Sequence, residues 1–88
     1  MRSTHVTVHG EVQGVFYRSA AEQEATSLGV AGWVRNADDG SVEMVVEGDD
    51  DAVEQMLAWA REGSEQARVT GVDVDDQEPQ GLSGFLQA

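Results

Sequence analysis

The stretch VAGWVRNADDGSVEMVVEG, residues 30–48, contains two runs of strand-forming residues separated by ADDG. The Asp-Gly pair at 39–40 is a strong turn signal, and Val42, Met44 and Val46 recur with the period of two that places them on one face of a strand. These features predict a β-hairpin over residues 30–48. The hairpin decides the fold because a helix is predicted on each side of it.

The two predicted helices are amphipathic. Ser19–Leu28 contains no Pro or Gly and is followed by Gly29, a common residue at the C-terminal end of a helix. In the second helix, Asp51 and Glu54 have the spacing of a capping box, and the helix is expected to end at Gly63. The predicted apolar faces consist of Ala21, Ala25 and Leu28 in the first helix and Val53, Met56, Leu57 and Ala60 in the second.

A strand is predicted outside each helix. HVTVH at residues 5–9 alternates apolar and polar side chains, as a half-buried strand does. On the other side, Val69, Val72 and Val74 indicate a strand whose alternation slips near Gly71, which is typical of a bulge. The following DDQEPQGLSG is predicted to be a loop, and the final FLQA a short last strand.

The order strand, helix, strand, strand, helix, strand is that of a ferredoxin-like α+β sandwich, with two helices packed on one face of an antiparallel sheet. Residues 1–88 show no internal repeat and no linker, so one domain is predicted. No run is long enough to cross a bilayer, and the N-terminus lacks the apolar segment of a signal peptide. We therefore expect a soluble cytoplasmic protein that does not bind membranes.

The chain is very acidic. It has 17 Asp and Glu against five basic residues, all of them Arg, which gives a formal net charge of −12. Binding to nucleic acid is not expected, because that requires basic surface. Such charge repels itself in dilute buffer and is tolerated when salt screens it, so a halophilic protein is one hypothesis. An acidic protein from a mesophile is the alternative.

Metal and cofactor sites are not predicted. The chain has no Cys, and His5 and His9 lie roughly 13 Å apart on a strand, too far to share one ion. The Asp residues lack EF-hand spacing, and the absence of Lys excludes a Walker A loop. We interpret the two histidines as solvent-side strand residues and the carboxylates as solvated surface.

The stretch GEVQGVFYR, residues 10–18, predicts an anion site. A glycine-flanked turn between a strand and a helix exposes successive backbone N–H groups, and these groups with the helix N-terminus can surround an anion. Arg18 lies at the start of that helix, where its charge opposes the helix dipole, so a bound phosphate would explain its position. A surface ion pair is the alternative interpretation of Arg18.

Two stretches with their spacing carry a family resemblance. VHGEVQGVFYR followed by GWVRNADDGSVEMVVEG resembles the acylphosphatase family, whose members carry G-x-V-Q-G-V-x-x-R and G-[WF]-V-x-N-x-x-x-G-x-V on this same fold. The resemblance implies that Asn36 orients the attacking water; taken alone, Asn36 would be interpreted as an Asx-turn residue. It also implies that the phosphate is held by Gln13, Gly14, Val15, Phe16, Tyr17 and Arg18, through the backbone and the guanidinium.

The implied function is metal-free hydrolysis of acyl phosphates to carboxylate and inorganic phosphate by a monomer, with phosphate as product and inhibitor. The chain departs from the family at Tyr17, where Phe is more common, and in SGFLQA, which lacks the basic residue usual near the C-terminus. Two alternatives stay open. One is a noncatalytic phosphate-binding or regulatory module, and the other is a carbamoyl-phosphate-processing domain of a larger protein.

Overall fold

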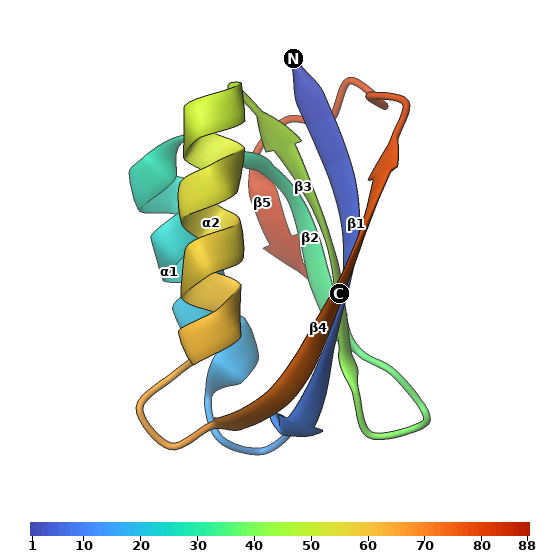
Figure 1. The fold of residues 1–88 in the computed structure, drawn as a ribbon. Coiled ribbons are helices and arrows are strands. Elements are labelled where there is room, and N and C mark those ends of the chain that lie inside the picture. Colours follow the sequence, from blue (N-terminus) through green and yellow to red (C-terminus); the bar gives the residue numbers. More distant parts are fainter.

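The computed structural model describes all of residues 1–88 and contains five strands and two helices (Figure 1). The elements in chain order are β1 (Arg2–Glu11), α1 (Tyr17–Leu28), β2 (Ala31–Asn36), β3 (Val42–Gly48), α2 (Asp50–Glu62), β4 (Arg68–Gln77) and β5 (Phe85–Gln87). The predicted order of strands and helices is therefore confirmed, as is the short last strand.

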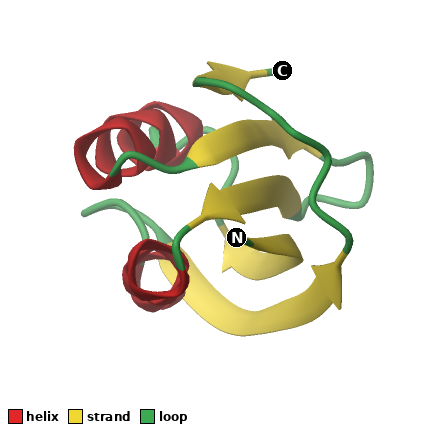
Figure 2. Ribbon diagram, turned by 90° about the horizontal axis from the view of Figure 1, so that it is seen from above, coloured by secondary structure: helices red, strands yellow, loops and turns green.

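The strands form one sheet in the order β4-β1-β3-β2-β5. Neighbouring strands are antiparallel except β5, which runs parallel to β2 and makes the sheet mixed. Both helices lie on the same side of the sheet (Figure 2). The other face carries no helix, and part of it is covered by the β4–β5 connection. This is the predicted ferredoxin-like sandwich, and β4 and β5 are its two edges.

The core lies between the sheet and the two helices, because alternate strand residues meet the apolar helix faces there. All the residues predicted to face the core from the hairpin and from the second helix are buried, as are Ala21 and Ala25 of the first helix. The cluster consists of Val6, Val8, Val12, Tyr17, Ala21, Ala25, Val30, Val34, Val42, Met44, Val46, Val53, Met56, Leu57, Ala60 and Phe85.

Helix α1 begins at Tyr17, two residues before the predicted start. The Tyr17 side chain is buried between the helices, where its ring lies 5.1 Å from that of Trp59 and its hydroxyl donates to the Ala60 carbonyl at 2.9 Å. Burial raises the pKa of the Tyr17 phenol well above its usual value. The first turn of α1 is thus fixed by a core contact that the spacing of its alanines did not reveal, and the Tyr hydroxyl has a partner.

The predicted capping box of α2 is wrong. Asp49 is the N-cap, with extended backbone and no side-chain capping bond, and its carbonyl accepts from the Val53 N–H at 2.9 Å. Asp51 lies inside the first turn, so its side chain is not placed to cap that turn. Asp50 and Asp51 still place negative charge at the positive end of the helix dipole, and Arg61 lies in the last turn.

The predicted bulge in β4 is confirmed. His9 of β1 pairs with Gly71 and Gly10 pairs with Val69, so Thr70 is the extra residue on β4. A Cβ on Gly10 would lie 2.1 Å from the Arg68 carbonyl oxygen, so only glycine fits at this crossing. The strand then continues to Gln77, into residues that the sequence predicted as loop.

Glu47 of β3 is a buried carboxylate on the sheet face that the helices do not cover. It accepts hydrogen bonds from the Ser3 hydroxyl at 2.9 Å and from the backbone N–H groups of Gln80 and Leu82 at 2.5 and 3.1 Å. Burial raises its pKa, but these hydrogen bonds lower it by more, so the pKa of Glu47 lies below its ordinary value. This carboxylate fastens the β4–β5 connection to the sheet.

Candidate active site

The loop between β1 and α1 lies at the same end of the molecule as the β2–β3 turn and the α2–β4 connection (Figure 1). Phe16 is the N-cap of α1 and has φ 63° and ψ 21°, the one non-glycine residue with positive φ. Gly14 also has positive φ, at 74°. A left-handed conformation costs a residue with a side chain about 1–2 kcal/mol, and such strain is concentrated at functional sites.

The backbone donors of this loop are free. None of the seven N–H groups from Gln13 to Ser19 donates a hydrogen bond within the chain, and the first intrahelical bond is from Ala20 to the Phe16 carbonyl, at 3.1 Å. The first three N–H groups of α1 are unpaired because a helix N-terminus has no preceding turn. Such a series of donors is the usual composition of an anion-binding loop.

Arg18 and Asn36 line one cavity of about 200 Å³ beside this loop. Arg18 is partly buried and takes part in none of the five ion pairs of the chain. The first turn of α1 holds no acidic residue, although α2 begins with two. The surface ion pair that was the alternative interpretation of Arg18 is therefore not formed. The Arg18 guanidinium is available for an external anion although the chain is rich in carboxylates.

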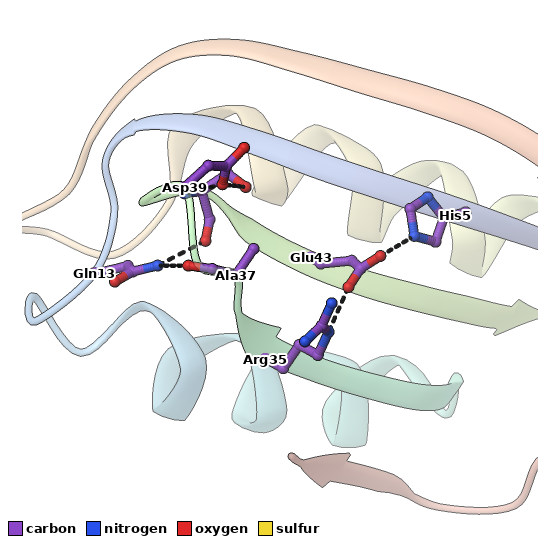
Figure 3. Close-up of polar contacts among 7 residues, drawn as sticks. His5, Gln13, Arg35, Ala37, Asp39 and Glu43 are labelled. Carbon is purple, nitrogen blue, oxygen red and sulfur yellow. Dashed lines mark hydrogen bonds and ion pairs between the residues drawn. The ribbon is translucent and has the colours of Figure 1, made fainter.

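The loop is held from two sides. The Gln13 amide donates to the carbonyls of Ala37 and Ser41 in the β2–β3 turn, both at 2.8 Å (Figure 3). The Ser64 hydroxyl, from the α2–β4 connection, donates to the Val15 carbonyl at 2.7 Å. These bonds fix the loop against the strand end that carries the candidate water-orienting asparagine.

Asn36 is the last residue of β2, and its side chain makes no hydrogen bond within the chain. The Asx turn is made instead by Asp39, whose Oδ1 accepts from the Ser41 hydroxyl and N–H at 2.6 and 3.0 Å. These two bonds, hydroxyl first, lower the pKa of Asp39. The Asx-turn interpretation of Asn36 is therefore wrong, and its amide is free to contact a molecule in the cavity.

The structure brings most of the predicted site residues together. The cavity is lined by Val12, Gly14, Phe16, Tyr17, Arg18, Ser19, Asn36 and Gln87. Gln13 and Val15 do not line it, because the Gln13 side chain extends to the β2–β3 turn and Val15 packs against the core. Val12, Ser19 and Gln87 line the cavity without having been predicted from the sequence. Nothing in the sequence pattern indicated that Gln87 of the short last strand would reach it.

The two histidines lie on the sheet face that carries no helix, and each contacts a different carboxylate. His5 bonds to Glu43, which also accepts from Arg35 (Figure 3). His9 bonds to Asp73 at 2.9 Å. The hydrogen bond with His5, assisted by Arg35, holds the pKa of Glu43 below its ordinary value although burial opposes it. No group of three metal-ligating side chains is assembled. Neither helix has the length and apolar character that spanning a membrane demands.

Comparisons with known proteins agree with the motifs. The family model described as Acylphosphatase matches residues 4–86. Proteins named Acylphosphatase from Thermococcus kodakarensis and Haloarcula marismortui are 52% and 53% identical to the chain over 81 residues, covering 92% of it and 89% of each relative. The crystal structure of acylphosphatase from Bacillus subtilis superimposes with a TM-score of 0.97 at 34% identity, covering 100% of this chain and 99% of that one.

Proposed function

Because the chain belongs to the acylphosphatase family and is an enzyme of that class, we propose that it hydrolyses the carboxyl–phosphate bond of acyl phosphates at the cavity beside Arg18. The Arg18 guanidinium donates two parallel hydrogen bonds to the phosphoryl group, and the N–H groups of the β1–α1 loop surround its remaining oxygens. Inorganic phosphate, the product, binds the same groups and inhibits.

Asn36 positions the water. Its side-chain carbonyl accepts a hydrogen bond from a water molecule that faces the phosphorus opposite the acyl oxygen. The water oxygen forms a new bond to phosphorus while the bond between phosphorus and the acyl oxygen breaks, and the electron pair leaves with the carboxylate. The water proton passes to a phosphoryl oxygen, so the products are carboxylate and inorganic phosphate.

This chemistry requires no general acid, because a carboxylate is a weakly basic leaving group that departs without protonation. Phosphoryl transfer through a loose transition state depends mainly on positioning and on stabilising charge over the phosphoryl oxygens. The residues around the cavity supply both the positioning and the stabilisation of charge. We therefore propose a mechanism that uses neither a metal nor a cofactor.

One observation carries the proposal. A loop with seven successive unpaired N–H groups, five of them on residues that line the cavity, lies beside an arginine without an ion pair and an asparagine without a hydrogen-bond partner. A module that only binds phosphate needs the first two features, but it has no use for an unpartnered amide at the cavity. The combination therefore favours hydrolysis over sensing.

The test is hydrolysis of benzoyl phosphate, followed by release of phosphate, with and without a chelator. We expect turnover that the chelator does not change, and a loss of at least ~10³-fold in kcat/KM for Arg18→Gln, the scale known for arginines acting on a transferring phosphoryl group. Arg18→Lys should not restore activity, because lysine lacks the planar fork.

Arg61→Gln is the matched control, because it removes the same charge from an exposed position in α2 that does not line the cavity. Absence of turnover by the unmodified protein contradicts the enzymatic proposal. Loss of turnover in the chelator contradicts the metal-free mechanism, and equal losses in the two arginine variants contradict the assignment of Arg18.

A further inference from the structure

The wall of the cavity contains a hydrogen bond that the proposed mechanism does not use. Gln87 of β5 lines the cavity, and its Nε2 donates to Oε1 of Glu22 in α1 at 2.9 Å. The bond joins two segments 65 residues apart in the sequence. It fixes the Glu22 carboxylate against a residue of the cavity wall.

The charge of Glu22 is not neutralised. Glu22 lies four residues after Arg18, and residues with this spacing are neighbours on a helix surface, with Cβ atoms about 5–6 Å apart. The two nevertheless form no ion pair, and Glu22 contacts no other cation. The neutral Gln87 amide satisfies the carboxylate as a hydrogen-bond acceptor and leaves its negative charge in place.

The cavity has one cation for one anion. Arg18 is the only basic residue among the eight that line it, and in the proposed function the phosphoryl group occupies Arg18. The acyl group then lies against the rest of the wall, which is apolar or neutral, with Glu22 behind Gln87. A second negative charge on the substrate would meet a carboxylate and no counter-ion.

We propose that Glu22, positioned by Gln87, is a specificity-determining residue that makes the enzyme select acyl phosphates whose acyl group carries no negative charge. The inference rests on the proposed function. Repulsion between Glu22 and a second negative charge on the other side of the Gln87 side chain, in surroundings nearly as polar as water, is expected to change kcat/KM about fivefold.

The experiment compares two substrates of nearly equal size and shape, 4-carbamoylbenzoyl phosphate and 4-carboxybenzoyl phosphate. The measured quantity is the ratio of their kcat/KM values in each protein at about 0.1 M ionic strength, where charges beyond about 10 Å are largely screened. Comparing this ratio between proteins cancels differences in intrinsic reactivity of the substrates. It also cancels any general loss of activity in a variant.

Glu22→Gln is the informative variant, because glutamine removes the charge and keeps a carbonyl that accepts from Gln87. We expect it to lower the preference for the neutral substrate about fivefold. Glu24→Gln is the matched control, with the same change of charge on the same helix; Glu24 lies near Trp59, away from the cavity. We expect the control to keep the ratio of the unmodified protein.

At an ionic strength of about 1 M the screening length is about 3 Å. The preference for the neutral substrate should then decrease in the unmodified protein and change little in Glu22→Gln. An unchanged ratio in Glu22→Gln, or an equal change in Glu24→Gln, overturns the inference and leaves the proposed function standing. Hydrolysis of neither substrate by the unmodified protein instead overturns the proposed function.

Discussion

Replacing Gln13 with alanine should separate the phosphate loop from the strand end that carries Asn36. In the structure the Gln13 amide is the side-chain link between the β1–α1 loop and the β2–β3 turn, through the carbonyls of Ala37 and Ser41. Gln13→Ala removes both hydrogen bonds and leaves the backbone of each segment intact. The loop and the turn then keep their local structure and lose their fixed relative position.

The expected loss of stability follows from the two bonds. Each carbonyl keeps a second donor, since Ala37 N–H donates to Ser41 at 2.9 Å and Gly40 N–H donates to Ala37 at 3.3 Å. Neither oxygen is therefore left unsatisfied, and the loss is that of two ordinary hydrogen bonds, about 2 kcal/mol in the free energy of unfolding. In a domain of this size that corresponds to a decrease in Tm of about 10 °C.

The assay combines thermal unfolding with hydrolysis of benzoyl phosphate below the transition. Turnover should fall at least ~10-fold, because misplacing a positioning group by about 1 Å has effects of up to 10²-fold. Gln66→Ala is the matched control, an exposed glutamine whose side chain makes no hydrogen bond. A Tm within about 3 °C of that control, with unchanged kcat, would refute the reasoning that Gln13 joins the two halves of the site.

Three further predictions concern the site and the charges. Asn36→Ala should lower kcat about 10²-fold and leave inhibition by inorganic phosphate almost unchanged; equal losses in both would place Asn36 in the phosphate site instead. Because the pKa of Glu47 is lowered in the folded state, its carboxylate stabilises the fold above the unfolded pKa, and that contribution disappears as pH falls through the folded pKa. The Tm difference between Glu47→Gln and the unmodified protein should therefore shrink between pH ~7 and about 3; a constant difference would contradict the assignment. If the chain is halophilic, Tm and turnover should both rise from dilute buffer to molar KCl, and a maximum near ~0.1 M salt would contradict that hypothesis.

The elements that could be predicted from the sequence are those in which local pattern and tertiary burial agree. The hairpin of residues 30–48 has a turn signal and alternating apolar residues that are in fact buried. The bulge near Gly71 was visible because three valines keep one face across a change of phase. Arg18 could be singled out because its charge opposes the dipole of the helix in which it lies.

The features that escaped prediction are contacts between distant segments. Glu47 looks like a solvent-facing strand residue, and only the path of the β4–β5 connection buries it beneath Gln80 and Leu82. Gln87 reaches the cavity because β5 pairs with β2, which no local pattern indicates. Gln13 lies in a loop, and no local pattern indicates that its side chain donates to two carbonyls of the β2–β3 turn.

The edges of the sheet determine how this chain meets other copies of itself. An exposed strand edge invites another strand to add to the sheet, unless its length, shape or charge prevents it. The β5 edge has only three residues, and the β4 edge is distorted at Thr70 and carries the exposed carboxylates Asp73, Asp75 and Asp76. A second copy approaching β4 would have to place the same carboxylates against them. Both edges therefore disfavour strand addition, and partly unfolded molecules whose β4 edge is intact are protected from aggregating through it.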